Sequence, residues 1–337
     1  MLTLYVTSDQ EDAGRTSICV TMASDISKKG KKVAVFKPFA ASPNDGSGKS
    51  DREILLSVSN VESNAEGSWP FNWVGSDNLD SVVADFQKCT TGAEVSVIEG
   101  LSSITADFGQ TSSQLVERID ARVVVVIAYV DGLGLESVQV AKELFGQRLE
   151  GIIINGVTKY KMREMQNQLA PMIEAIGVKV LAIVPESRVM LGFTVGELAR
   201  HLGGTFLNSE DKSESLIEHY LIGGMILDWG VLYFERFANK AVIVRGDRPD
   251  IQMAALKTPT SCIVLTGGFE PIQYVQYEAG EEEVPLISVN SDTLQTTSSL
   301  ESLHGKAIFG HPAKVEQFAR AVNGNGNLEG FYLALGV

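Results

Sequence analysis

The segment TSDQEDAGRTS, residues 7–17, lies between a strand-like run and a helix-like run at the start of the chain. Residues 1–6 (MLTLYV) have the apolar character of a buried strand, and residues 17–32 (SICVTMASDISKKGKK) have that of a helix. The segment ends in Gly-Arg-Thr at residues 14–16. In this order, the backbone N–H groups at a helix N-terminus can bind phosphate. The segment therefore predicts a phosphate-binding loop at the start of an α/β domain.

This loop departs from the usual pattern in three ways. Arg15 stands where a lysine is expected, and its broad planar group replaces a compact point charge. The first glycine of the motif is replaced by Ser8 or Asp9. Asp9, Glu11 and Asp12 add negative charge that should repel a polyphosphate. The sequence thus predicts a degenerate nucleotide site, and catalytic turnover stays in doubt because the loop lysine is missing.

Residues 43–50 (PNDGSGKS) offer a rival loop, since they end in Gly48-Lys49-Ser50. Their surroundings form a long stretch rich in Ser, Gly and Asn rather than a tight turn between strand and helix. The alternative interpretation is an exposed surface loop.

Short apolar runs alternate with helix-like segments through the first part of the chain, which predicts a doubly wound, mostly parallel sheet. A Gly-rich and then polar stretch at 201–215 indicates a domain boundary. The sequence then predicts an α/β domain over 1–207, a smaller α/β domain over 215–322 and a C-terminal tail over 323–337. The strand-like runs of the first domain are LTLYVT (2–7), KVAVFKPF (32–39), EVSVIEG (94–100), RVVVVIAYV (122–130), LEGIIINGV (149–157) and VKVLAIVP (178–185).

Composition limits the classes of function. The chain has 337 residues, 44% of them hydrophobic and 21% charged, and a net charge of −14. Such acidity argues against nucleic acid and anionic membranes as partners. We expect no membrane span and no secretion leader. Three widely spaced cysteines and four histidines without ligand spacing predict a reducing compartment, the cytoplasm, with no zinc or haem.

Two charged residues follow strands of the first domain. Lys37 lies near the end of the second strand-like run and Glu99 near the end of the third, at the edge where doubly wound sheets bind ligands. An acid there suits a Mg²⁺ ligand or a group that orients water. The alternative for Glu99 is a polar residue that merely ends a strand.

The first domain resembles the dethiobiotin-synthetase-like (BioD-like) branch of P-loop proteins. The resemblance rests on four segments in this order: the loop at 7–17, FKP (36–38), IEG (98–100) and IIINGV (152–157). The resemblance implies ATP or another nucleotide, with Mg²⁺, as a ligand. It implies nucleotide-binding roles for Gly14, Arg15, Thr16, Ser17, Lys37 and Asn155, and Mg²⁺-binding roles for Thr16, Asp51 and Glu99.

The second half contains three segments in the order of the DRTGG domain: GDRPDIQMAAL (246–256), VLTGG (264–268) and SDTLQTTSSLESL (291–303). Two of the polar clusters follow apolar strands, so their loops should meet at one sheet edge and form a small-ligand site. The alternative is that Asp247 and Arg248 form an internal ion pair, or a polar cluster at a domain or subunit contact. The predicted site residues are Asp247, Arg248, Thr266, Gly267, Gly268, Asp292 and Thr293.

The two domains in this order resemble the N-terminal, non-catalytic portion of long bacterial phosphotransacetylases and stand-alone proteins of the same plan. The resemblance implies a regulatory or ligand-sensing protein, and acetyl transfer is not predicted. One alternative is an ATP-dependent amidoligase or carboxylate-activating enzyme, similar to dethiobiotin or cobyrinic acid diamide synthases. Another is a structural subunit that acts through oligomeric contacts. A small molecule is the expected ligand, and a homo-oligomer, such as a dimer, is the expected assembly.

Overall fold

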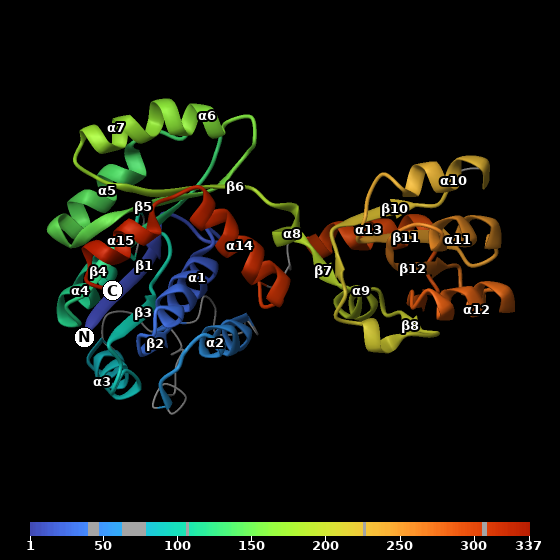
Figure 1. The fold of residues 1–337 in the computed structure, drawn as a ribbon, viewed down its shortest axis with the longest axis horizontal. Helices are drawn as coiled ribbons and strands as arrows, with labels where there is room; N and C mark the ends of the chain where they lie inside the picture. Colours follow the sequence, from blue (N-terminus) through green and yellow to red (C-terminus); the bar gives the residue numbers. More distant parts are fainter. Residues whose placement is uncertain (40–46, 63–78, 106–107, 225–226, 305–308) are drawn as a thin grey trace. The chain divides into compact units, whose positions relative to one another are not determined.

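The computed structural model describes two compact units of the chain (Figure 1). The first unit comprises Met1–Glu186 and Phe309–Val337, and the second comprises Ser187–Ile308. No helix in the described part of the chain is long and apolar enough to cross a membrane. The described residues are 1–39, 47–62, 79–105, 108–224, 227–304 and 309–337.

A six-stranded sheet with the order β2-β3-β1-β4-β5-β6 forms the centre of the first unit, and all of its pairs are parallel. Each of the six predicted strand-like runs forms one strand of this sheet, which confirms the doubly wound α/β fold. The strands are β1 (Leu2–Ser8), β2 (Val33–Phe36), β3 (Val95–Glu99), β4 (Arg122–Ala128), β5 (Leu149–Val157) and β6 (Val180–Pro185).

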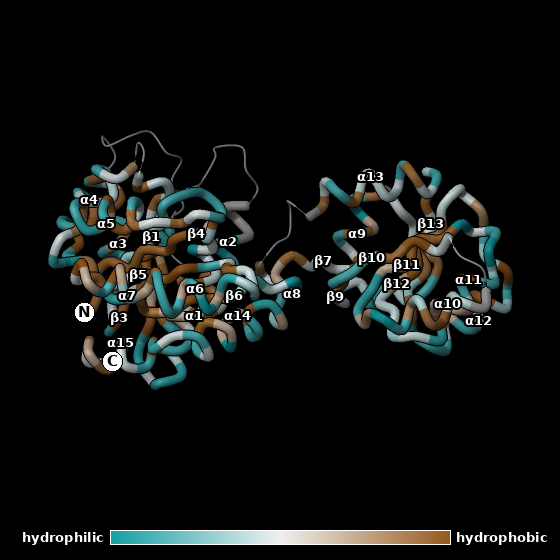
Figure 2. The backbone as a smooth tube through the Cα atoms, turned by 90° about the horizontal axis from the view of Figure 1, so that it is seen from above, coloured by the Kyte–Doolittle hydropathy of each residue, from teal (hydrophilic) through white to brown (hydrophobic). Residues whose placement is uncertain are grey.

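Helices pack on both faces of this sheet because its strands are apolar in both directions. One series of contacts runs from α2 through α1 to α14, and another runs from α3 through α4 to α5. The hydrophobic colours follow the strands, whereas the helices alternate along their length (Figure 2). The helices are α1 (Arg15–Lys28), α2 (Ser47–Ser57), α3 (Leu79–Cys89), α4 (Gly109–Arg118), α5 (Glu136–Phe145), α6 (Met162–Glu164), α7 (Ala170–Ala175), α14 (Pro312–Gly324) and α15 (Leu328–Ala334), with a π-helical turn at Met165–Leu169.

The last two helices return to the first unit from the far end of the sequence. Asn323 of α14 donates a hydrogen bond to Asp25 of α1 at 3.0 Å, and Lys29 pairs with Glu329 of α15 at 2.5 Å. Figure 1 shows α14 beside α1. Burial of Phe318 and the other apolar side chains on α14 and α15 drives this return.

The second unit contains a five-stranded sheet with the order β10-β11-β12-β13-β8, in which only β8 is antiparallel. Its strands are β8 (Thr205–Phe206), β10 (His219–Ile222), β11 (Lys240–Arg245), β12 (Thr260–Thr266) and β13 (Leu286–Ser288), beside a small β7 (Phe193–Thr194) and β9 (Leu216–Ile217) pair. Its helices are α8 (Arg188–Leu191), α9 (Val195–Leu202), α10 (Leu227–Phe234), α11 (Pro249–Leu256), α12 (Gln273–Glu281) and α13 (Thr293–His304), with a 3-10 turn at Glu210–Lys212.

The structure divides the chain at other positions than the sequence predicts. The predicted boundary near 205 falls inside the second unit, because Leu198 of α9 packs in the same cluster as Ile243 and Cys262 of the second sheet. The predicted end of that domain at 322 and the tail at 323–337 fall within helices of the first unit.

Candidate functional site

The N-terminal loop ends at the first residue of α1, as a phosphate loop requires. Gly14 caps the helix with a φ of 91°, and an added Cβ would lie 2.4 Å from the Nδ2 atom of Asn155. Only glycine tolerates both conditions without strain. The Asn155 side chain, one of the predicted nucleotide-binding groups, donates a hydrogen bond to the Ala13 carbonyl at 2.9 Å and so stabilises the loop. Arg15 points to the end of β3, where its Nη1 atom donates to the Gly100 carbonyl at 2.5 Å.

The acidic residues of the loop differ in their surroundings. Asp9 is 9% exposed, and its carboxylate accepts hydrogen bonds from the Ala128 N–H at 3.1 Å and from the Ser137 hydroxyl at 3.3 Å. Burial raises the pKa of Asp9, although these hydrogen bonds lower it in part. Glu11 and Asp12 are exposed. Asp9 therefore ties the loop to the end of β4 and to the start of α5, a role that the expectation of simple repulsion missed.

Lys37, Asp51 and Glu99 come together beside this loop from three separate elements. Lys37 follows β2, Asp51 lies in the first half of α2, and Glu99 is the last residue of β3. The Lys37 ammonium pairs with the Asp51 carboxylate and donates to the Glu99 Oε1 atom at 2.9 Å. Lys37 and Glu99 are 5% and 2% exposed, so water screens their pair weakly.

One ammonium faces two carboxylates in this cluster, and the pKa values reflect that imbalance. Burial lowers the pKa of Lys37, but Glu99 and Asp51 together raise it above its ordinary value. Burial and repulsion from Glu99 raise the pKa of Asp51, despite the opposing effect of Lys37. The pKa values of Lys37 and Asp51 are both raised because the cluster carries one more negative charge than positive charge, which favours a proton on either group. Arg15 adds positive charge near the cluster and lowers the pKa of Asp51.

The donor set at this position suits a hard cation such as Mg²⁺. Carboxylate and hydroxyl oxygens are its preferred ligands, and Thr16 lies in the first turn of α1. The second Glu99 oxygen, Oε2, is buried and has no hydrogen-bond partner among the described residues. Among those residues, however, no three His, Cys, Asp or Glu side chains converge, and the Lys37 ammonium lies between the two carboxylates. The predicted Mg²⁺ site stays a prediction.

Ser17 and the rival loop remain from the predicted phosphate-binding residues. Ser17 is 6% exposed in the first turn of α1, and its carbonyl accepts a hydrogen bond from Thr21 at 2.9 Å. The rival loop lies partly at 43–46, outside the described residues, and its Gly48-Lys49-Ser50 ending forms part of the first turn of α2.

In the second unit, both predicted clusters occupy the carboxyl edge of the sheet. Arg245, the last residue of β11, pairs with Asp247 at 2.5 Å, and its guanidinium lies 6.0 Å from the centre of the Phe269 ring. Arg248 binds the Asp250 carboxylate through two nitrogens, at 2.9 and 2.8 Å. The ion pairs thus run from Arg245 to Asp247 and from Arg248 to Asp250, rather than between the two residues that the sequence singled out. Arg245 was missed, although its place directly after an apolar strand was a signal.

The loop after β12 meets the loop after β11 at this edge. Gly267 and Gly268 have φ values of 87° and 69°, and their N–H groups donate to carbonyls of the segment that follows β13. The buried Thr266 hydroxyl lies 2.9 Å from the Thr293 hydroxyl. The Asp292 carboxylate accepts a hydrogen bond from the Gln295 N–H at 2.8 Å, which makes it a cap of α13. The predicted residues are therefore neighbours, and part of their bonding maintains the loops.

Comparisons with known proteins identify two successive domains along the chain. Residues 2–191 match the family model described as an AAA domain, and residues 197–303 match the model described as a DRTGG domain. The order of the two domains confirms the resemblance stated from the sequence.

Two curated relatives cover different shares of the chain. A phosphate acetyltransferase of Haemophilus influenzae is 24% identical over 94% of this chain and 50% of its own length. The ATP-dependent dethiobiotin synthetase BioD of Bacillus velezensis is 26% identical over 55% of this chain and 87% of its own length. The chain spans about half the length of the phosphate acetyltransferases that it matches. Among solved structures, a nucleotide-binding protein from Archaeoglobus fulgidus, in complex with ADP, covers 55% of this chain and 82% of its own, at 13% identity and a TM-score of 0.39.

Proposed function

The chain belongs to the AAA-domain family over its first 191 residues, and from that premise we propose that it is a regulatory, ligand-sensing protein. Its N-terminal domain binds a nucleotide such as ATP and turns it over slowly or not at all. Its DRTGG domain binds a second small molecule. The phosphate acetyltransferase relatives are about twice as long as this chain, and their acetyl-transfer activity is not part of the proposed function.

The direction of Arg15 carries this proposal. A loop lysine would supply a compact charge to the phosphates, whereas the Arg15 guanidinium donates to the Gly100 carbonyl at the end of β3. The loop thus keeps its glycine, its helix N-terminus and its neighbouring Lys37, but it directs no lysine charge at the transferred phosphate. Binding energy from the backbone N–H groups remains, while stabilisation of a transition state is reduced.

Isothermal titration with ATP, ADP and GTP, with and without Mg²⁺, tests the binding. We expect nucleotide to bind and Glu99→Gln to abolish the part that depends on Mg²⁺. Glu143→Gln, at an exposed position on α5, is the matched control and should bind as the parent does. Absence of binding at millimolar nucleotide contradicts the proposal for the first domain.

The Arg15 substitutions separate a weakened loop from a simple turn. Arg15→Lys should raise ATP affinity if the loop still surrounds phosphate. If Arg15→Ala and Arg15→Lys both leave every titration unchanged, the segment is a structural turn.

A second candidate is an ATP-dependent carboxylate-activating enzyme, which the buried Lys37–Glu99 pair favours. Phosphate release distinguishes the two. A Mg²⁺-dependent rate above about 1 s⁻¹, within the ordinary range for enzymes, supports the enzyme and rejects a purely sensing role.

The proposed compartment and partners follow from the net charge and the composition of the chain. The protein acts in the cytoplasm, without nucleic acid or membrane as a partner, and forms a homo-oligomer such as a dimer. Light scattering after size-exclusion chromatography measures the assembly. A monomer at micromolar concentration contradicts the proposed assembly, and it also contradicts the alternative of a purely structural subunit.

A further inference from the structure

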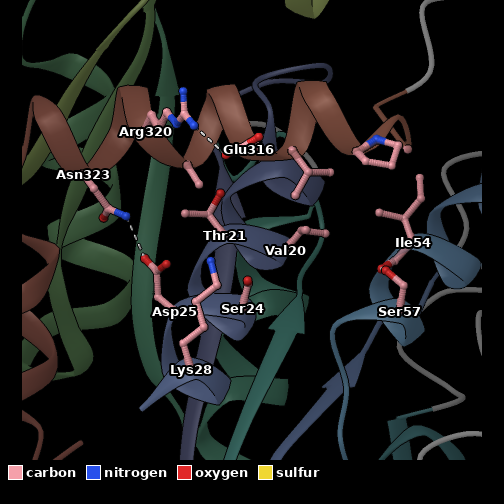
Figure 3. A pocket seen from close by; sticks show the side chains of 14 residues that line it. Val20, Thr21, Ser24, Asp25, Lys28, Ile54, Ser57, Glu316, Arg320 and Asn323 are labelled. Carbon is pink, nitrogen blue, oxygen red and sulfur yellow. Dashed lines mark hydrogen bonds and ion pairs between the residues drawn. The ribbon is translucent and has the colours of Figure 1, made fainter. Parts of the chain in front are cut away.

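A cavity of about 520 Å³ lies between α1, α2 and α14 in the first unit. This volume falls within the range of about 300–1,000 Å³ that small-molecule sites occupy. Figure 3 shows side chains from all three helices around it. The cavity lies along the later turns of α1, between Val20 and Lys28, whereas the phosphate loop precedes the first turn of that helix. It is therefore a separate site.

The two ends of the cavity differ in chemistry. Figure 3 shows Asp25, Lys28 and Asn323 at one end and Ile54 at the other. The apolar lining consists of Val20, Ile54, Pro312, Val315 and Ala319. The polar lining consists of Thr21, Ser24, Asp25, Lys28, Ser57, Glu316, Arg320 and Asn323. A ligand that fills the cavity needs one polar end and one aliphatic end.

The polar end presents charges of both signs in equal number. Asp25 is half-buried and accepts a hydrogen bond from Asn323, while Lys28 lies on the next turn of α1. Glu316 and Arg320 pair with each other at 2.6 Å on the exposed rim. A ligand with a single charge would meet one attractive and one repulsive partner. A zwitterion satisfies both signs at once.

A second, more polar cavity of about 420 Å³ adjoins this end. The two cavities share Asp25, Lys28 and Asn323, so these three residues separate one from the other. The charged head group of a ligand at this junction can contact both Asp25 and Lys28, while the aliphatic part of the ligand extends towards Val20 and Ile54.

We propose that this cavity binds an α-amino acid with an aliphatic side chain. The Asp25 carboxylate receives the ammonium group, and the Lys28 ammonium receives the carboxylate. The side chain of the ligand contacts Val20, Ile54 and their apolar neighbours. Because α1 also carries the phosphate loop, the two ligands share one helix. The site does not depend on the proposed nucleotide binding.

A set of four related compounds tests the chemistry by isothermal titration in the absence of nucleotide. L-leucine carries both charges and the aliphatic part. 3-Methylbutylamine lacks the carboxylate, 4-methylpentanoate lacks the ammonium, and glycine lacks the side chain. We expect leucine to bind and each of the other three to bind at least about tenfold more weakly, since each loses one type of contact. Valine, isoleucine and methionine complete the panel of side chains.

Substitutions locate the binding. Lys28→Met and Asp25→Asn should each weaken leucine binding about tenfold, whereas Lys88→Met, an exposed lysine of α3, should not change it. Ala319→Phe should fill part of the cavity and abolish binding in a protein that keeps its circular dichroism spectrum. Arg15→Ala should keep leucine binding, so failure of the nucleotide proposal leaves this one intact.

Three results overturn the proposal. The first is no binding of any aliphatic amino acid at about 10 mM. The second is equal binding of leucine and one of its singly charged analogues. The third is unchanged affinity in Lys28→Met, Asp25→Asn and Ala319→Phe alike.

Discussion

Replacing Lys37 by Met should destabilise the first unit strongly at neutral pH. The change leaves the Glu99 carboxylate, which is 2% exposed, beside Asp51 with no ammonium between them. Removing one partner of a buried ion pair costs about 3–5 kcal/mol. The Lys37 side chain is 7% exposed, so water offsets little of this cost. Because about 1.4 kcal/mol is a factor of ten, amides that exchange only on unfolding should exchange roughly 100- to 4,000-fold faster.

Hydrogen exchange followed by mass spectrometry measures this effect on each unit separately. Peptides from β1 and β3 report on the first unit, and peptides from β11 and β12 serve as an internal control in the second. The double variant Lys37→Met/Glu99→Gln removes the unpaired charge and should recover most of the protection. If exchange in β1 is unchanged in Lys37→Met, or if the double variant is no better than the single one, the charge argument is wrong.

The pH dependence of the same variant has a definite sign. In the parent protein the pKa of Lys37 is raised, so its stabilising effect is complete below the unfolded value of 10.5 and disappears as the pH rises through the folded value. In Lys37→Met no ammonium opposes the burial and the repulsion from Glu99 that raise the pKa of Asp51. The deficit should therefore shrink as the pH falls from 7 to 5, because protonation of Asp51 removes the repulsion between the two carboxylates. A deficit that grows over this interval contradicts the assignment.

Three smaller changes test other parts of the structure. Gly14→Ala should lower the free energy of unfolding of the first unit by about 1–3 kcal/mol, because residue 14 has a positive φ and its Cβ would meet Asn155. In the double variant Gly14→Ala/Asn155→Ala only the steric clash should be relieved, as measured by hydrogen exchange in β1. Thr194→Ala removes one half of the capping box that Thr194 forms with Glu197 on α9, and it should lower the free energy of unfolding of the second unit by about 1 kcal/mol. Hydrogen exchange in β11 measures this loss, and unchanged exchange would mean that the cap does not stabilise the unit. Tyr332→Phe should leave the melting temperature equal or higher, because the buried Tyr332 hydroxyl has no partner among the described residues; a large decrease would reveal one.

Local patterns in the sequence were sufficient to predict the two sheets. β-Branched runs such as VVVV at 123–126 are buried on both faces, and their alternation with helices requires parallel pairing. The division of the chain could not be predicted in this way. Leu198 and Phe318 are each ordinary members of amphipathic helices, and no local pattern states which sheet their helix will cover.

The candidate site was predictable where it depends on strand ends. Lys37 and Glu99 follow or end strands that the sequence identified, and neighbouring parallel strands bring such residues together. The directions of Arg15, Asp9 and Asn155 were not predictable. Each is set by a hydrogen bond to a residue about 85–140 positions away, and the residue type alone does not specify that partner.

The return of α14 and α15 to the first unit has a consequence for the order of events during synthesis. The ribosome completes β6 and then makes about 120 residues of another unit before these two helices exist. At roughly 5–20 residues per second, that interval lasts about 6–24 s. Throughout it the nascent first unit lacks α14 and α15, and apolar side chains of α1 such as Val20 lack this cover. The cavity between α1, α2 and α14 forms last, after the whole second unit has been synthesised.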